Sequence, residues 1–87
     1  MTMYDENDLI YSPLQQTISE GDRWVKVCIY RMPDSQWILE VEDDKGASTV
    51  WDDRFDSDQA ALEVALADIK AVGVVDFIDM PPRDKLH

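Results

Sequence analysis

Histidine, cysteine and glycine are all scarce in this sequence of 87 residues, and the scarcity limits its chemistry. The one cysteine, Cys28, excludes an intramolecular disulfide. The one histidine, His87, is the last residue, where we expect no fold to hold it in place. Serine–histidine and cysteine–histidine pairs and histidine-based zinc sites are therefore not expected. Three isolated glycines provide no phosphate-binding loop. From these missing parts we expect a non-catalytic protein without a cofactor.

Basic residues are also few. Eight Lys and Arg against nineteen Asp and Glu give a net charge of −11 and a pI near 4.1. Direct binding to nucleic acid or to an anionic membrane needs a basic surface, so neither is expected. The acidic excess has two interpretations: it keeps a small protein in solution, or it serves to bind a basic partner.

Long apolar runs are absent: no stretch reaches the 18 residues that a membrane-spanning helix needs. The first residues carry three acids and no cation, which is unlike a secretory signal. We therefore expect a cytoplasmic location. The 45% apolar content is enough for one small core. We expect a single domain over residues 13–80, with an acidic arm at 1–12 and a tail at 81–87.

What the sequence does contain is a series of short segments with β-type alternation of apolar and polar residues. Gly21-Asp22, Pro33 and Gly46 mark the turns between them. The pattern predicts an α+β fold whose four-stranded antiparallel meander is covered on one face by one helix. The predicted strands are 14–19, 23–31, 37–42 and 48–53.

The turn lengths fix a register, because a slip of one residue would exchange the two faces of a strand. The first turn aligns Leu14 with Ile29. The other predicted pairs are Gln16–Val27, Ile18–Val25, Val27–Val41, Ile29–Leu39, Val41–Thr49, Leu39–Trp51, Arg31–Trp37, Lys26–Glu42, Tyr30–Ile38 and Glu40–Val50. The pairs gather most of the apolar side chains on one face and place Lys26 opposite Glu42 on the other.

A helix is predicted over 57–72, capped by Asp56 or Ser57 and followed by Gly73. Its apolar positions recur at spacings of three and four, which forms a stripe suited to cover the sheet. These positions are Leu62, Ala65, Leu66, Ile69 and Val72. The apolar run 74–78 that follows is predicted to be a short extended segment, ended by the prolines after it.

Two features were considered as chemical sites. The acidic run that joins the last strand to the helix (Asp52, Asp53, Asp56 and Asp58) has oxygen ligands of the kind that Mg²⁺ and Ca²⁺ prefer. It lacks the glycine and the distal glutamate of a calcium loop, and capping accounts for its last two members, so no metal site is predicted. Cys28 is predicted to be a half-buried structural thiol, because Glu40 opposite it counteracts Lys26.

The second face of the predicted sheet is unusually apolar for a surface exposed to water. We predict it to be an interaction surface, made by Trp24, Cys28, Tyr30, Ile38 and Val50. Its occupant is either a second copy of the chain, or the chain's own segments 1–12 or 74–78. If it is a second copy, Trp24→Asp or Tyr30→Asp should give a monomer.

Three functional hypotheses follow. The leading one is a homodimeric, non-catalytic module for protein–protein interaction. The alternative is an inhibitor that presents carboxylates in place of phosphates to a basic nucleic-acid-binding protein. A small metal-dependent enzyme is the least supported of the three, because no metal-ligand pattern is present.

Overall fold

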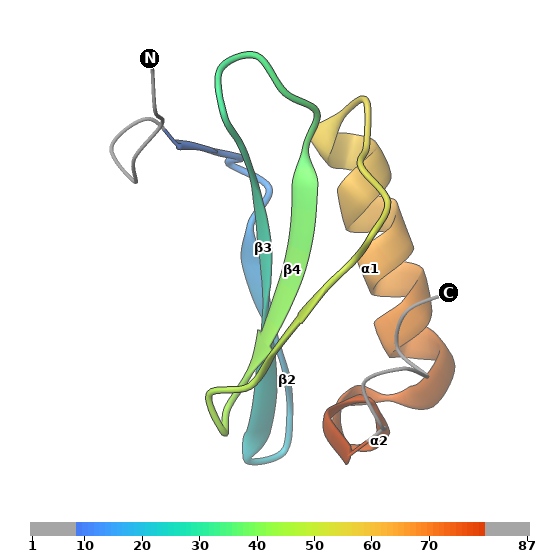
Figure 1. Cartoon of the computed structure of the whole chain (residues 1–87). Helices are drawn as coiled ribbons and strands as arrows, with labels where there is room; N and C mark the ends of the chain where they lie inside the picture. Colours follow the sequence, from blue (N-terminus) through green and yellow to red (C-terminus); the bar gives the residue numbers. More distant parts are fainter. Residues whose placement is uncertain (1–8, 80–87) are drawn as a thin grey trace.

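The computed structural model describes residues 9–79, which form an antiparallel sheet with two helices on one of its faces (Figure 1). The elements are β1 (Ile10–Tyr11), β2 (Gln16–Glu20), β3 (Arg23–Arg31), β4 (Ile38–Asp43), β5 (Ser48–Val50), α1 (Asp58–Val72) and α2 (Val74–Asp79). The predicted α+β class, with a helix packed on an antiparallel meander, is confirmed.

The register of the central strands is as predicted. Val27 lies opposite Val41, which in turn lies opposite Thr49, and Lys26 lies opposite Glu42. This register sends one set of alternate side chains of β3 and β4 toward the helices, where they are buried: Val25, Val27, Ile29, Leu39 and Val41. The buried core comprises Val25, Val27, Ile29, Leu39, Val41, Trp51, Ala61, Leu62, Ala65, Ile69, Val74, Phe77 and Ile78.

The start of the meander differs from the prediction. The β2 strand begins at Gln16, and Leu14 lies in a turn instead of pairing with Ile29. Pro13 has no N–H to donate to a sheet, and the chain leaves the ladder around it. The groups of Ile29 are satisfied in another way: its N–H donates to the side-chain oxygen of Gln15 (2.9 Å), and its carbonyl accepts from the N–H of Ser12 (2.9 Å).

Before this turn in the chain, β1 pairs with the end of β3, which places Tyr11 opposite Tyr30. Part of the predicted N-terminal arm therefore belongs to the sheet. The last strand is shorter than predicted: β5 ends at Val50, and Trp37 makes an isolated bridge to Phe55. Most of the segment predicted as an arm, residues 1–8, lies outside the described residues, as does 80–87.

Helix α1 is built as its sequence indicates. The Ser57 hydroxyl accepts a hydrogen bond from the N–H of Ala60 (3.1 Å), and Asp58 places a negative charge in the first turn. At the other end Gly73 has a φ of +85°, a conformation that favours glycine. Its N–H donates to the carbonyl of Ile69 (2.7 Å), and the chain then changes direction.

The prediction of an extended segment at 74–78 is wrong, because Val74–Asp79 forms helix α2. Helical spacing puts Val74, Phe77 and Ile78 on one side, and all three are buried. Phe77 stacks on Trp51 with ring centroids 6.4 Å apart and planes 9° from parallel. Packing against the sheet thus overrides the β preference of this apolar run. Neither helix in the described part of the chain is long and apolar enough to cross a membrane.

Candidate interaction surface

The helices leave one face of the sheet uncovered by any other described element (Figure 1). We call it the open face. Alternate residues of a strand point to opposite sides, so residues whose neighbours are buried against the helices point outward here. All five predicted surface residues belong to it: Trp24, Cys28, Tyr30, Ile38 and Val50.

The structure divides these residues into separate groups. Tyr30 lies opposite Ile38 on β4 and opposite Tyr11 on β1, so three apolar side chains form a row across the sheet. Cys28 and Val50 lie in the next row, on either side of Glu40.

Trp24 lies at the other end of β3, beyond the row that contains Lys26 and Glu42. A charged row therefore separates Trp24 from the Tyr30 group. The side chain of Trp24 is 38% exposed and that of Val50 is 41% exposed. The other three predicted residues are half-buried.

Tyr11 belongs to the open face but was not predicted as part of it. It is 55% exposed, and its ring lies 6.3 Å from that of Tyr30 between centroids, tilted by 50°. The sequence carried a weak signal, the apolar triplet 9–11, but gave no register for it. That register exists because Ser12 and Gln15 complete the ladder at Ile29 and bring the chain back to the edge of β3.

Tyr30 is anchored by its hydroxyl, which donates a hydrogen bond to Oε1 of Glu40 (2.8 Å). Burial, and then this bond to a carboxylate, raises the pKa of Tyr30 to about 12. The hydroxyl remains protonated at physiological pH, so it can keep its bond to Glu40. Glu40 is therefore a partner of Tyr30 and not an independent charge on this face.

The raised pKa of Tyr30 gives a test at high pH. Because the folded state holds this proton more tightly than the unfolded state, with its ordinary pKa of 10.0, the stabilisation is complete below pH 10.0. It should be lost as the pH rises from there to about 12. Tyr30→Phe should remove the highest-pH transition in the ultraviolet phenolate titration, whereas Tyr11→Phe should leave it in place. An unchanged titration in Tyr30→Phe would contradict the assignment.

Cys28 does not have the setting of a nucleophile. Burial is the main cause that raises the pKa of its thiol, Lys26 counteracts it, and Glu40 and Glu42 add to it. A raised pKa keeps the group as a thiol instead of the reactive thiolate. The structure thus agrees with the interpretation of Cys28 as a structural residue.

The end of the open face near Trp24 is fixed by an ion pair. Arg23 binds Asp44 through two bonds, of 2.8 and 3.0 Å, and the same carboxylate accepts from the backbone N–H of Trp24 (3.1 Å). The hydrogen bonds from Arg23 lower the pKa of Asp44. This contact joins the start of β3, where Trp24 lies, to the turn after β4.

The open face contains an open hollow of about 320 Å³. Lys26, Cys28, Tyr30, Glu40 and Glu42 line it together with Leu9, Tyr11 and Gln15. It brings one cation, two carboxylates and two tyrosine rings together. Such a mixture of charged and aromatic side chains suits contact with a protein surface.

The acidic run 52–58 is dispersed by the fold. Asp58 accepts a hydrogen bond from the Ser12 hydroxyl (2.8 Å), and Asp56 accepts one from the Gln36 amide. Arg54 directs its guanidinium to the carbonyls of Trp51 and Asp52. Within residues 9–79, no three acidic, cysteine or histidine side chains come together as a metal site would require.

Comparisons of the chain with known protein families, with curated proteins and with solved structures give no match.

Proposed function

We propose that this protein is a non-catalytic protein–protein interaction module that forms a homodimer through the open face. The observation that carries the proposal is the row Tyr11–Tyr30–Ile38, which runs across three strands on a face that the helices leave uncovered. Exposed aromatic residues grouped on one surface are typical of interface centres. Val50 extends this surface to β5, and Trp24 lies on the same face beyond the row of Lys26 and Glu42.

A second copy suits this face because its charges are self-complementary. Lys26 lies beside Glu40 and Glu42, and no salt bridge among residues 9–79 uses it. A two-fold axis through the middle of the face would let Lys26 of each copy approach a carboxylate of the other. Burial of the face would also enlarge the core of a chain of only 87 residues.

The acidic charge opposes dimer formation, which gives the proposal a characteristic salt dependence. Each chain carries −11, so two copies repel each other at long range. Salt screens that repulsion over about 10 Å at 0.1 M but leaves apolar contact largely intact. The dimer should therefore become tighter as salt rises, the reverse of an interface held by opposite net charges.

The test is native mass by sedimentation at micromolar concentration. The wild type should have twice the 10.0 kDa mass of one chain. Tyr11→Asp or Trp24→Asp should give a folded monomer, because a carboxylate on the open face would be desolvated in the interface. Ala67→Asp is the matched control, since it adds the same charge at an exposed position of α1 and should remain dimeric. A monomeric wild type would refute the homodimer.

The polyanion hypothesis has weaker support. It rests on the net charge, yet Asp43, Asp44, Asp58 and Glu40 are each engaged by groups of the same chain. Carboxylates that are already bonded within the fold are less available to imitate a row of phosphates. The interaction module needs only the side chains that remain exposed.

A further inference from the structure

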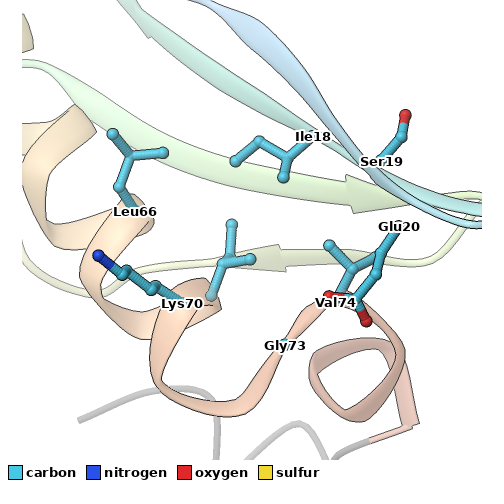
Figure 2. Close-up of a pocket in the computed structure, with 8 residues that line it drawn as sticks. Ile18, Ser19, Glu20, Leu66, Lys70, Gly73 and Val74 are labelled. Carbon is cyan, nitrogen blue, oxygen red and sulfur yellow. The ribbon is translucent and has the colours of Figure 1, made fainter.

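A second surface lies on the helix side of the sheet, at the edge formed by β2. A groove of about 380 Å³ runs between β2 and the C-terminal half of α1 (Figure 2). Its lining is mainly apolar: Ile18 and Leu66 are half-buried along it, and Ile69 and Val74 are buried beneath it. Ser19, Glu20, Lys70 and Gly73 complete the lining.

The strand beside this groove has an unpaired edge. Both β1 and β2 pair with β3, and β2 pairs with no other described strand. In an antiparallel ladder, alternate residues direct their backbone groups to the same neighbour. Ile29 directs its groups to the β2 side, whereas the N–H of Trp24 faces Asp44 on the β4 side. The odd-numbered residues of β3 therefore bond to β2.

The consequence for β2 follows from its register. The residues of β2 that lie opposite the odd-numbered positions of β3 are Gln16, Ile18 and Glu20. Their backbone N–H and C=O groups point toward β3 and bond to it. Thr17 and Ser19 therefore direct their N–H and C=O groups outward, and no partner for them lies among residues 9–79. Exposed edges are commonly protected by lysine, proline or a bulge, and β2 has none of these.

We infer that β2 and this groove bind an extended segment of another protein, which adds to the sheet as a further strand. The segment would bond to the outward groups of Thr17 and Ser19. Its side chains would point alternately to the two faces of the sheet. One that points to the helix side would enter the groove above Leu66, so backbone bonds give affinity and the groove gives selectivity.

The charges at the rim define the segment further. Glu20 lies two residues from Ile18 on the same face of β2, and no hydrogen bond or salt bridge engages its carboxylate within residues 9–79. If the segment has an apolar residue opposite Ile18, the residue two positions from it lies on the same face, opposite Glu20. A lysine or arginine there would pair with it, and a basic segment suits a chain of charge −11. The same net charge disfavours a second copy as the occupant.

The experiment selects binders from a phage-displayed library of random peptides, with the full chain as bait. Enriched peptides should contain an apolar residue and a lysine or arginine separated by one position. One enriched peptide, labelled with fluorescein, is then titrated by fluorescence anisotropy. We expect Leu66→Asp and Ser19→Pro each to raise the Kd of the peptide by about tenfold or more. The first variant places a charge in the apolar groove, and the second removes an outward N–H from the edge of β2.

Two controls keep the outcome decisive. A version of the peptide that is N-methylated at alternate positions should lose binding without any change to the protein, because it cannot complete the ladder. Tyr11→Asp, on the open face and opposite Tyr30 instead of β2, should bind the peptide as the wild type does, so failure of the homodimer proposal would not affect this result. The inference is overturned if no peptide is enriched, or if Leu66→Asp and N-methylation both leave Kd unchanged. It is also overturned if the Tyr11→Asp protein is still a dimer and Ser19→Pro dissociates that dimer, because a second copy would then occupy the edge of β2.

Discussion

Phe77→Ala is expected to remove a large share of the stability of this protein. Phe77 is 2% exposed, stacks on Trp51 and is held in α2 by the bond from its N–H to the carbonyl of Gly73 (2.9 Å). Replacement of a buried phenylalanine by alanine costs about 3–5 kcal/mol. A chain of 87 residues has a free energy of unfolding of about 4–13 kcal/mol, so the loss is a large share of the total.

The measurement is urea unfolding followed by circular dichroism and by tryptophan fluorescence. Asp76→Ala is the matched control: it changes the preceding residue of the same helix, but its side chain is exposed, so the expected change is within about 0.5 kcal/mol. If 74–78 were an extended segment outside the core, Phe77→Ala would be as mild as its control. That result would contradict the position of α2.

Trp51→Ala is the second change with a large expected effect. Trp51 is 3% exposed, follows β5 directly, and donates its N–H to the carbonyl of Leu39 (3.1 Å). Loss of the indole would leave Phe77 without its stacking partner and open a cavity beneath the sheet. We expect a loss of about 3–5 kcal/mol in the free energy of unfolding, measured by the same urea titration.

Val50→Thr is the control for Trp51→Ala, and it tests the register itself. Val50 precedes Trp51 but faces the other side of the sheet, where it is 41% exposed. Threonine keeps its shape and its β preference, so the effect should stay within about 0.5 kcal/mol. A slip of one residue would reverse the two results. Both proteins should be compared at one concentration, since dimer formation would add to stability.

The open face and the groove along β2 lie on different sides of the sheet, and Tyr11→Asp and Leu66→Asp each change only one of them. Ser19 lies directly opposite Trp24, so variants at these two positions are not independent of each other. Trp24 and Tyr11 lie on the face away from the helices, whereas Leu66 lies on α1 beside β2 (Figure 2). A dimer formed through one surface leaves the other accessible. The protein could thus present two copies of the groove to a partner with two extended segments, which would raise the apparent affinity.

Alternation and turn chemistry were sufficient to predict most of the sheet. Gly21-Asp22 fixed the pairing of Ile18 with Val25, and the later turns fixed Val27 opposite Val41. These predictions succeeded because period and turn length are local properties that together leave one register. The same reasoning failed at Leu14, where Pro13 diverts the chain and the side chain of Gln15 takes the place of a backbone group.

The candidate surface was predicted in part. All five predicted residues share the open face, because the parity of each strand decides which side its residues face. They were predicted as one patch, whereas the structure separates Trp24 from the Tyr30 row by the row of Lys26 and Glu42. Tyr11 was missed because its position depends on Ser12 and Gln15, which replace a regular strand with contacts that no periodic pattern reveals.

The sequence by itself determined the β-meander, its register, the limits of α1 and the two faces of the sheet, since each depends on spacing along the chain. Only the tertiary structure decided that 74–79 is helical, that 10–11 joins the sheet and that a groove lies beside β2. These features depend on what a segment packs against. An apolar run such as 74–78 suits a strand or a helix equally well until Trp51 and the sheet provide the surface that buries Phe77.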